Sequence, residues 1–392
     1  MKYKQWKIYI LLIMSEDTYG GTKRKELKLI NSGAFGCIFS PTLTCNGEVG
    51  SAKYITKIQK SERAISNELR ISEKVRHITG YARFFAPVIK HCPVKIAKDR
   101  VNDLKKCEVF EGESRKTIES SSYISMKTRY VGDKDLRVHI FSNSEIITFL
   151  TAFFTTYSHL LKAIKKLVSN KIIHFDLKYN NVIFDPVKRL PIIIDFGQSW
   201  ALDEIQTEKQ LYTAFFVFDQ YDYWCIDILI CSYIFQKVGY KESQTEMVTE
   251  AEINHIYDVF IHGKDKTGNE PLPTEKKILN DAYLYNILQN PSKMKNFKAT
   301  LDEYTNQFIN KRTWWELYED LIKNANIWDS YSLAIIYLNM LDDVFLSENE
   351  MYSKLLGASN GRLKKFVELM ENVVYSAPNK RPSIQTLLAM EF

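Results

Sequence analysis

Residues 172–184, with the sequence IIHFDLKYNNVIF, place several polar side chains between two apolar runs. The polar residues are His174, Asp176, Lys178, Asn180 and Asn181, and Asp195 follows nineteen residues after Asp176 in IIIDFG. Phosphoryl transfer uses these residue types, because carboxylate and amide oxygens bind Mg²⁺, a cation steadies the phosphate and a base accepts the hydroxyl proton. The alternative is a polar turn whose side chains hydrogen-bond within the turn itself.

These motifs resemble those of the protein kinases. HFDLKYNN is similar to the catalytic loop H-R-D-x-K-x-x-N, and IIIDFG contains the metal-binding D-F-G. The resemblance implies that Asp176 orients the attacking hydroxyl and accepts its proton, while Lys178 steadies the transferring phosphate. It also implies that Asn181 and Asp195 hold Mg²⁺ and that ATP donates the phosphate.

Upstream, the stretch LINSGAFGCIF resembles the glycine-rich loop G-x-G-x-x-G that covers the phosphates of ATP. Gly33 and Gly36 are present, and Asn31 stands where the first glycine belongs. Asparagine tolerates a left-handed backbone better than most residues, so the turn can be kept. The resemblance implies that Asn31, Gly33, Gly36 and Ile38 contact the nucleotide.

Two lysines compete as the anchor of the phosphates. YITK matches the kinase motif V-A-I-K at Lys57, whereas Lys53 lies closer to the usual distance from the glycines. Strand alternation does not decide, because both positions share one face. An insertion in the preceding loop explains the extra residues, so we expect Lys57 to be the anchor and Glu68 its helical partner. Solvated surface charges are the alternative for both.

The stretch MKTRYVGDKDL resembles the segment that joins the two lobes of a kinase. The distance back from Leu136 places Thr128 at the gatekeeper position and the next three residues at the hinge. The resemblance implies that Thr128, Arg129, Tyr130 and Val131 border adenine. An edge strand without a ligand is the rival interpretation.

Two stretches compete for the helix that supports the catalytic loop, DYWCIDILI from Asp222 and WDSYSLAII from Trp328. The second fits better, because Asp329 lies 52 residues before Arg381, a distance suited to one compact lobe. Asp227 in WCID then falls where kinases carry A-P-E. A carboxylate in so apolar a run needs a partner, and Arg381 is our candidate. Alternatively, Asp227 caps a helix or faces solvent.

The elements that must position these residues are strands first and helices later. Residues 27–58 read as short strands, 61–76 as an amphipathic helix and 122–131 as a further strand. A capping box at Ser142 and Glu145 should open a long helix that ends near Asn170.

This order predicts an α+β fold with two lobes and a cleft between them. We expect an N-terminal extension at 1–25, a β-rich kinase N-lobe at 26–131 and a helical C-lobe at 132–392 with an insertion at about 232–326. The insertion should be helical, with capping boxes at Thr249 and Glu252 and at Thr300 and Glu303, and broken near GNEPLP.

Composition indicates an ordinary globular protein. Of the 392 residues 45% are apolar, enough for a large core, and the net charge of +6 is spread along the chain, so no nucleic-acid partner is expected. The apolar run Ile8–Met14 is too short to cross a bilayer. The six cysteines do not read as a disulfide framework, so we expect packed thiols in a reducing, intracellular setting. The oligomeric state is left open.

Lys178 resembles the serine/threonine class, so protein Ser and Thr hydroxyls are the expected acceptors. Phe175 replaces the arginine of H-R-D, on which an activation-loop phosphate docks in other kinases, so we expect activity without such phosphorylation. The rival functions are a nucleotide-binding pseudokinase scaffold and a small-molecule kinase of the aminoglycoside or choline type.

A narrower resemblance rests on GAFGCIFSPTLTC, YITKI, HFDLKYNN and the long insertion before WDSYSLAI. Together they resemble protein kinases encoded by large nucleocytoplasmic DNA viruses. That resemblance implies work in the host cytoplasm or packaging in virions.

Overall fold

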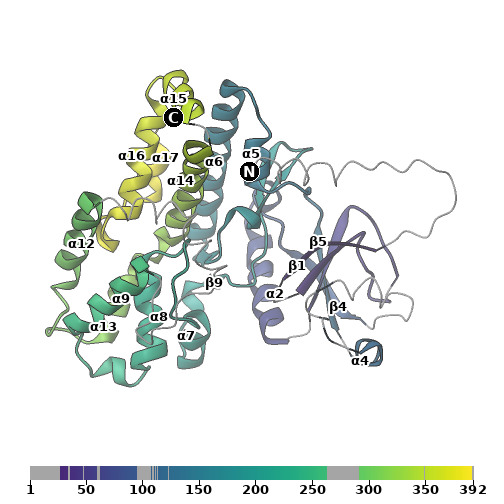
Figure 1. Ribbon diagram of the computed structural model, residues 1–392. Helices are drawn as coiled ribbons and strands as arrows, with labels where there is room; N and C mark the ends of the chain where they lie inside the picture. Colours follow the sequence, from purple (N-terminus) through teal and green to yellow (C-terminus); the bar gives the residue numbers. More distant parts are fainter. Residues whose placement is uncertain are drawn as a thin grey trace.

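The structure is a computed structural model, and it describes residues 27–33, 36–46, 48–59, 62–94, 114–121, 123–262, 291–347 and 349–390 together with residues 107, 110 and 112. A β-sheet lobe and a helical lobe lie side by side (Figure 1). The predicted α+β class with two lobes is therefore confirmed. The predicted extension at 1–25 and the break at GNEPLP lie outside the described residues.

Five antiparallel strands form the first lobe, in the order β1-β2-β3-β5-β4. Their bounds are β1 Lys28–Gly33, β2 Gly36–Ser40, β3 Tyr54–Gln59, β4 Val88–Val94 and β5 Tyr123–Arg129. Gly36 has a φ of 151°, and a Cβ atom there would lie 2.6 Å from the carbonyl oxygen of Ile58, so only glycine lets β2 approach β3 this closely. The register pairs Ile38 with Lys57.

Helix α2, Glu62–His77, lies between the sheet and the helical lobe (Figure 1). Its side chain Ile65 packs with Met126 of the sheet, whereas Ile71 and Val75 belong to the large core of the helical lobe. These apolar residues alternate with charged and polar ones along the helix, as the amphipathic pattern predicts. The two lobes therefore share α2.

The helical lobe contains the remaining elements. Its α-helices are α5 Leu136–Phe141, α6 Ile146–Ser169, α7 Glu208–Ala214, α8 Ile226–Tyr233, α9 Glu250–His262, α12 Pro291–Thr305, α13 Trp314–Lys323, α14 Trp328–Ser347, α15 Asn349–Ala358, α16 Arg362–Tyr375 and α17 Ile384–Ala389. Its short strands are β6 Ile172–Ile173, β7 Val182–Asp185, β8 Leu190–Ile193 and β9 Trp200–Ala201. The sheet lobe adds the short helix α4 Arg115–Ser120.

Short turns of other helical types join these elements. They are η1 Tyr81–Arg83, η4 Tyr179–Asn181, η5 Leu202–Glu204, the π-helical η6 Ile234–Val238, η7 Glu242–Gln244, η8 Ala325–Ile327 and η9 Pro378–Lys380. None of the helices described here is both long enough and apolar enough to cross a membrane.

Aromatic packing holds α6, α14 and α16 together. The rings of Phe153 and Tyr157 on α6 meet Tyr337 of α14 at 4.9 and 5.2 Å, both edge to face. Phe366 of α16 meets the same two rings at 5.2 and 4.9 Å. Edge-to-face contacts are favoured geometries that add to the energy of burial, so this cluster fixes the helix on which the catalytic loop rests.

The long helix ends at Asn170 as predicted, but the predicted capping box at its start is wrong. Ser142 lies at the end of α5, and its hydroxyl donates to the carbonyl oxygen of His139 at 2.7 Å. Glu145 occupies the N-cap position without a side-chain capping bond. A serine hydroxyl can donate to a carbonyl oxygen one turn back or accept from an amide ahead, and Ser142 makes the first kind of bond.

The described part of the predicted insertion at 232–326 is mainly helical, and an isolated β-bridge joins Met247 to Thr313. Thr249 and Glu252 do cap α9, because the Glu252 amide donates to Thr249 Oγ1 at 3.3 Å. The predicted box at Thr300 and Glu303 is wrong, since Thr300 lies inside α12 and bonds a carbonyl oxygen one turn back.

Four of the six cysteines are paired, which corrects the expectation of packed thiols. Disulfides join Cys37 to Cys107 and Cys45 to Cys92, across 70 and 47 residues of chain. Such separations carry no spacing signal, because the sheet and its loops bring the partners together. The remaining thiols, of Cys225 and Cys231, are buried, and burial raises the pKa of both.

A buried ion pair ties α8 to the C-terminal end of the chain. Asp227, in the first turn of α8, lies 2.8 Å from Arg381, and both side chains are 0% exposed. Trp328 Nε1 donates to Asp227 Oδ2 at 3.1 Å, which joins the start of α14 to the same carboxylate. The partner predicted for Asp227 is therefore confirmed.

Arg381→Met should lower the free energy of unfolding by about 3–5 kcal/mol, because it leaves the Asp227 carboxylate charged and unpaired in an apolar interior. Urea denaturation of the full chain measures this loss.

Lys380→Met is the matched control. Lys380 pairs with Glu303, but these side chains are 49% and 66% exposed. Pairs so exposed contribute about 0.2–1 kcal/mol. Equal losses in the two variants would contradict the role assigned to the buried pair.

Candidate active site

A cavity of about 310 Å³ lies where the sheet, α2 and the helical lobe meet. It collects most of the residues predicted to bind nucleotide, together with the predicted lysine partner Glu68 and the predicted metal ligand Asp195. The nucleotide residues are Asn31, Ile38, Lys57, Thr128, Arg129, Tyr130 and Val131. Gly33 ends β1 and Gly36 begins β2, at the turn beside the cavity, but neither is among its lining residues. The cavity is thus bordered by one lobe's strands and the other lobe's Asp195.

Lys57 connects the two sides of this cavity. Its Nζ lies 2.9 Å from Glu68 Oε2 on α2 and 3.0 Å from Asp195 Oδ1. Lys53 precedes β3 with an exposed side chain, so the structure places Lys57, not Lys53, beside both acids. The loop 41–53 between β2 and β3 accounts for the long separation in sequence between the glycines and Lys57.

Electrostatics favour the charged forms of Lys57 and Asp195, whereas burial raises the pKa of Glu68. Burial alone would lower the pKa of Lys57, but the carboxylates of Asp195 and Glu68 outweigh burial and raise that pKa. For Asp195, burial opposes ionisation while the Lys57 ammonium and the Gly197 amide favour it, and the pKa ends below its ordinary value. A charged lysine and a charged aspartate suit a site for phosphate and metal.

The hinge residues meet the cavity in different ways. Thr128 lies in β5, and Val131 is buried below it. The Arg129 side chain is engaged elsewhere, since it donates to Asp185 Oδ2 and to the carbonyl oxygen of Ala82, both at 3.0 Å. Arg129 can therefore offer a nucleotide its backbone, as the resemblance implied.

Asp176 is the centre of a hydrogen-bonded cluster on the catalytic loop. Lys178 Nζ lies 2.9 Å from Asp176 Oδ2, and Asn181 Nδ2 donates to the same oxygen at 2.9 Å. The Ile194 amide donates to the Asn181 carbonyl at 2.9 Å, which joins the loop to the strand leading into Asp195. These are hydrogen bonds that a polar turn would also make. Here they hold Asp176, Lys178 and Asn181 together next to the strand that leads into Asp195.

Asn181 and Asp195 suit Mg²⁺ in kind and number. Asn181 uses its amide nitrogen on Asp176, so a cation can meet only its amide oxygen. One amide and one carboxylate fit an ion that keeps waters and takes further oxygens from substrate phosphates. The described part of the chain holds no cluster of three or more His, Cys, Asp or Glu that could hold a metal ion.

Asp329 supports the catalytic loop from below. At the start of α14 it accepts the amides of His174 at 2.7 Å and Phe175 at 3.0 Å. Phe175 has a φ of 69° and Asp195 one of 59°, a left-handed backbone that costs energy outside glycine. The two amide bonds offset that cost at Phe175. The preference for Asp329 over Asp222 as the supporting acid is confirmed.

Aromatic packing replaces the missing arginine of H-R-D. The Phe175 ring lies 5.2 Å from Trp224, 6.0 Å from Phe215 and 6.1 Å from Trp328. Trp224 Nε1 also donates to the Phe175 carbonyl at 2.8 Å. The segment before α8 is therefore fastened to the catalytic loop without any charge.

Sequence reasoning missed Tyr221. Its hydroxyl donates to Asp176 Oδ1 at 2.7 Å, and Lys178 Nζ lies 6.0 Å from the centre of its ring. Burial and the neighbouring Asp176 raise the pKa of Tyr221, so the phenol stays protonated and donates. Nothing local in YDYW marks the contact, which joins residues 45 apart in the chain.

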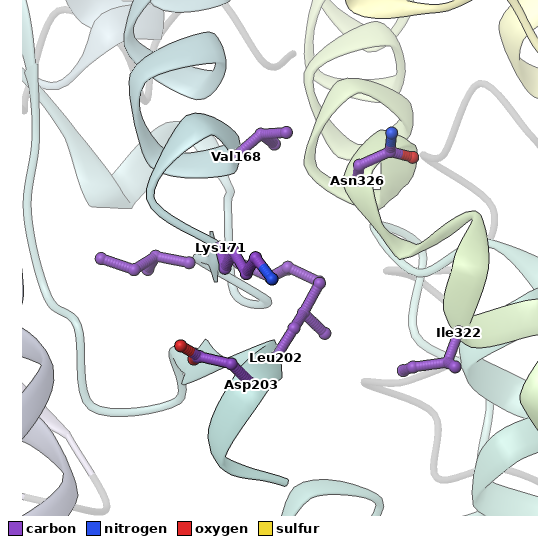
Figure 2. Close-up of a pocket in the computed structure, with 8 residues that line it drawn as sticks. Val168, Lys171, Leu202, Asp203, Ile322 and Asn326 are labelled. Atoms are coloured by element: carbon purple, nitrogen blue, oxygen red, sulfur yellow. The ribbon is translucent and has the colours of Figure 1, made fainter.

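A second cavity, of about 420 Å³, lies away from these residues. Figure 2 shows Val168 and Lys171 at the end of α6, Leu202 and Asp203 on η5, and Ile322 and Asn326 around it. None of the predicted site residues lines this cavity. The chemistry therefore belongs to the smaller cavity between the lobes.

Comparison with known proteins agrees with this geometry. A family model described as the protein kinase domain matches residues 24–392. No curated protein sequence gives a significant match. The match covers both lobes, from the glycine-containing strands through Asp176 and Asp195 to Arg381. The chain belongs to the protein kinase family, and its two-lobed α+β architecture is the protein kinase fold.

Proposed function

We propose that this kinase is active and transfers the γ-phosphate of Mg-ATP to serine and threonine hydroxyls of proteins. One observation carries the proposal: Lys57 joins Glu68 and Asp195 at the cavity, while Asp176 and Asn181 occupy the adjoining loop. The residue types that phosphoryl transfer needs are thus gathered at the cavity and the adjoining loop.

In the proposed reaction Lys57 binds the phosphates of ATP, and Asn181 and Asp195 would hold Mg²⁺, which neutralises charge on the phosphates. Asp176 orients the acceptor hydroxyl. As the new O–P bond forms and the bond from the γ-phosphorus to its bridging oxygen breaks, the hydroxyl proton passes to Asp176. Lys178 steadies the phosphoryl group in transit, and ADP leaves.

One feature supports alcohol acceptors over phenols: Lys178 follows the catalytic aspartate by two residues, as in the serine/threonine class.

A nucleotide-binding pseudokinase is the second candidate, favoured by one observation. Asp176 is engaged by Tyr221, Lys178 and Asn181 at once, so an acceptor must displace one of these bonds. A protein in which that displacement failed would bind ATP without turnover.

Labelled γ-phosphate from Mg-ATP should pass to serine or threonine of casein, a basic protein or the chain itself. Asp176→Asn should lower the rate by about 100-fold or more, because it removes the proton acceptor. Asp195→Asn should do the same by weakening the metal site. Absence of transfer, together with stabilisation by ATP in thermal melts, would favour the pseudokinase.

Lys57 and Lys53 form a matched pair for the same assay. Lys57→Met should abolish transfer and weaken ATP binding, because it removes the ammonium between Glu68 and Asp195. Lys53→Met should leave both unchanged, since this side chain is exposed outside β3. Loss of ATP binding in the Lys53 variant alone would reverse the assignment.

Turnover should not require phosphorylation after the D-F-G motif. Ser199 is buried and donates to the His174 carbonyl at 3.0 Å, Thr207 caps α7, and Thr213 bonds a carbonyl within α7. Alanine at Ser199, Thr207 or Thr213, or Tyr212→Phe, should retain transfer wherever the thermal melt shows a folded protein. Loss of turnover in a folded variant contradicts this proposal.

The viral resemblance leads to a proposal about location, with the host cytoplasm and the virion as the two settings. Disulfides persist in oxidising surroundings and are rare in the cytosol. The pairs Cys37–Cys107 and Cys45–Cys92 therefore favour the virion of the two. Thiol labelling of protein from particles should modify neither pair, and full labelling there would contradict the proposal.

A further inference from the structure

We infer that Glu204 is a positioning residue for the reaction: it fastens helix α2 to the segment that follows Asp195. The inference rests on the proposed function. It goes beyond that function by naming the group that holds Glu68 against Lys57 without modification.

Glu204 ends η5, and both of its oxygens face cations of α2. Lys74 Nζ lies 2.7 Å from Glu204 Oε1, and Arg70 pairs with Oε2. Arg70 and Lys74 are four residues apart, so they lie on one face of the helix. One carboxylate therefore pairs with two cations of α2, one on each oxygen.

The same helix face continues to the D-F-G motif. Asn67 Nδ2 donates to the carbonyl oxygens of Gly197 at 3.1 Å and Ser199 at 2.9 Å. Arg70 in turn donates to Asn67 Oδ1 at 2.8 Å. An unbroken chain of polar contacts therefore runs from Glu204 along α2 to the backbone just after Asp195.

Glu68 is the next residue after Asn67, and its contact with Lys57 depends on how α2 is turned. A rotation of α2 that freed Asn67 and Arg70 would carry Glu68 away from Lys57, since all lie on one rigid helix. Each ion pair is about one-third exposed and weak by itself, with side chains 37%, 34% and 32% exposed for Arg70, Lys74 and Glu204. Two pairs on one carboxylate, coupled through Asn67, bias the position of the whole helix.

Phe175 offers no charge to the segment after Asp195. Its ring packs among Trp224, Phe215 and Trp328 instead. The segment after Asp195 is thus held at two places by unmodified residues. Aromatic packing holds its later part to the catalytic loop, and Glu204 holds its earlier part to α2.

The test is a double-mutant cycle on turnover, with hydrogen exchange as a second measurement. Glu204→Gln and Lys74→Gln should each lower kcat by about threefold or more with little change in KM for the protein acceptor. The double variant should be no slower than the slower single variant, because Glu204→Gln already removes the ion pair with Lys74. Additive losses would overturn the inference.

Glu208→Gln is the matched control, since Glu208 is an exposed acid four residues further on, in the first turn of α7. It should leave kcat unchanged. An equal loss in the Glu208 variant would show a general charge effect and overturn the role of Glu204.

Hydrogen exchange separates this inference from the proposed function. In Glu204→Gln, amides of α2 and of residues 197–205 should exchange faster than in the parent chain, whether or not the parent transfers phosphate. If the parent is inactive, the proposed function fails and exchange alone decides on Glu204. Unchanged exchange in both segments would overturn the inference.

Discussion

The Lys57 ammonium, held between Glu68 and Asp195, is the contact on which the site depends. Lys57 lies on β3, and its partners come from α2 and the loop after β8, so one cation joins both lobes and the helix between them. Taking these charges out of water is costly, and the cost is offset only while all three groups stay together. The sheet register, the position of α2 and the backbone at Asp195 must therefore all be fixed by other contacts.

Those other contacts differ in kind between the lobes. On the catalytic side the contacts are buried. Asp329 accepts hydrogen bonds from two amides of the catalytic loop, and the ion pair of Asp227 with Arg381 fixes the start of α8. On the α2 side, the contacts are partly exposed ion pairs and amide bonds to Glu204 and its neighbours. Breaking a buried polar contact costs much free energy, whereas an exposed ion pair contributes little and is broken easily. Buried contacts thus hold the catalytic loop, whereas partly exposed ones hold α2.

Much of the site could be predicted because its signals are local. The spacing of Asp176, Asn181 and Asp195 marks a loop between two short strands, and Lys57 could be chosen over Lys53 from its strand. Even one distant pair, Asp227 with Arg381, followed from the cost of an unpaired carboxylate in an apolar run. In each case a few neighbouring residues show which group the site or the core needs at that position.

The rest could not be predicted, because it depends on which surfaces meet. The disulfide of Cys45 with Cys92 needs two loops to converge, and the capping pattern at Ser142 gave way to a carbonyl at the end of α5. Glu204 in the sequence is one acid among many, and only the packed fold shows that two cations of α2 face it. Long-range contacts of polar surface residues carry no periodic signal.

Tyr221 shows how a contact that fills the site can still permit the reaction. Its hydroxyl gives Asp176 the same kind of bond that an acceptor hydroxyl would give. Exchanging one O–H···O bond for another changes little free energy, provided that the displaced phenol finds water or another partner. Lys178 and Asn181 keep Asp176 oriented during that exchange, since both hold the other carboxylate oxygen. Asp176 is therefore never left without partners in its partly buried position.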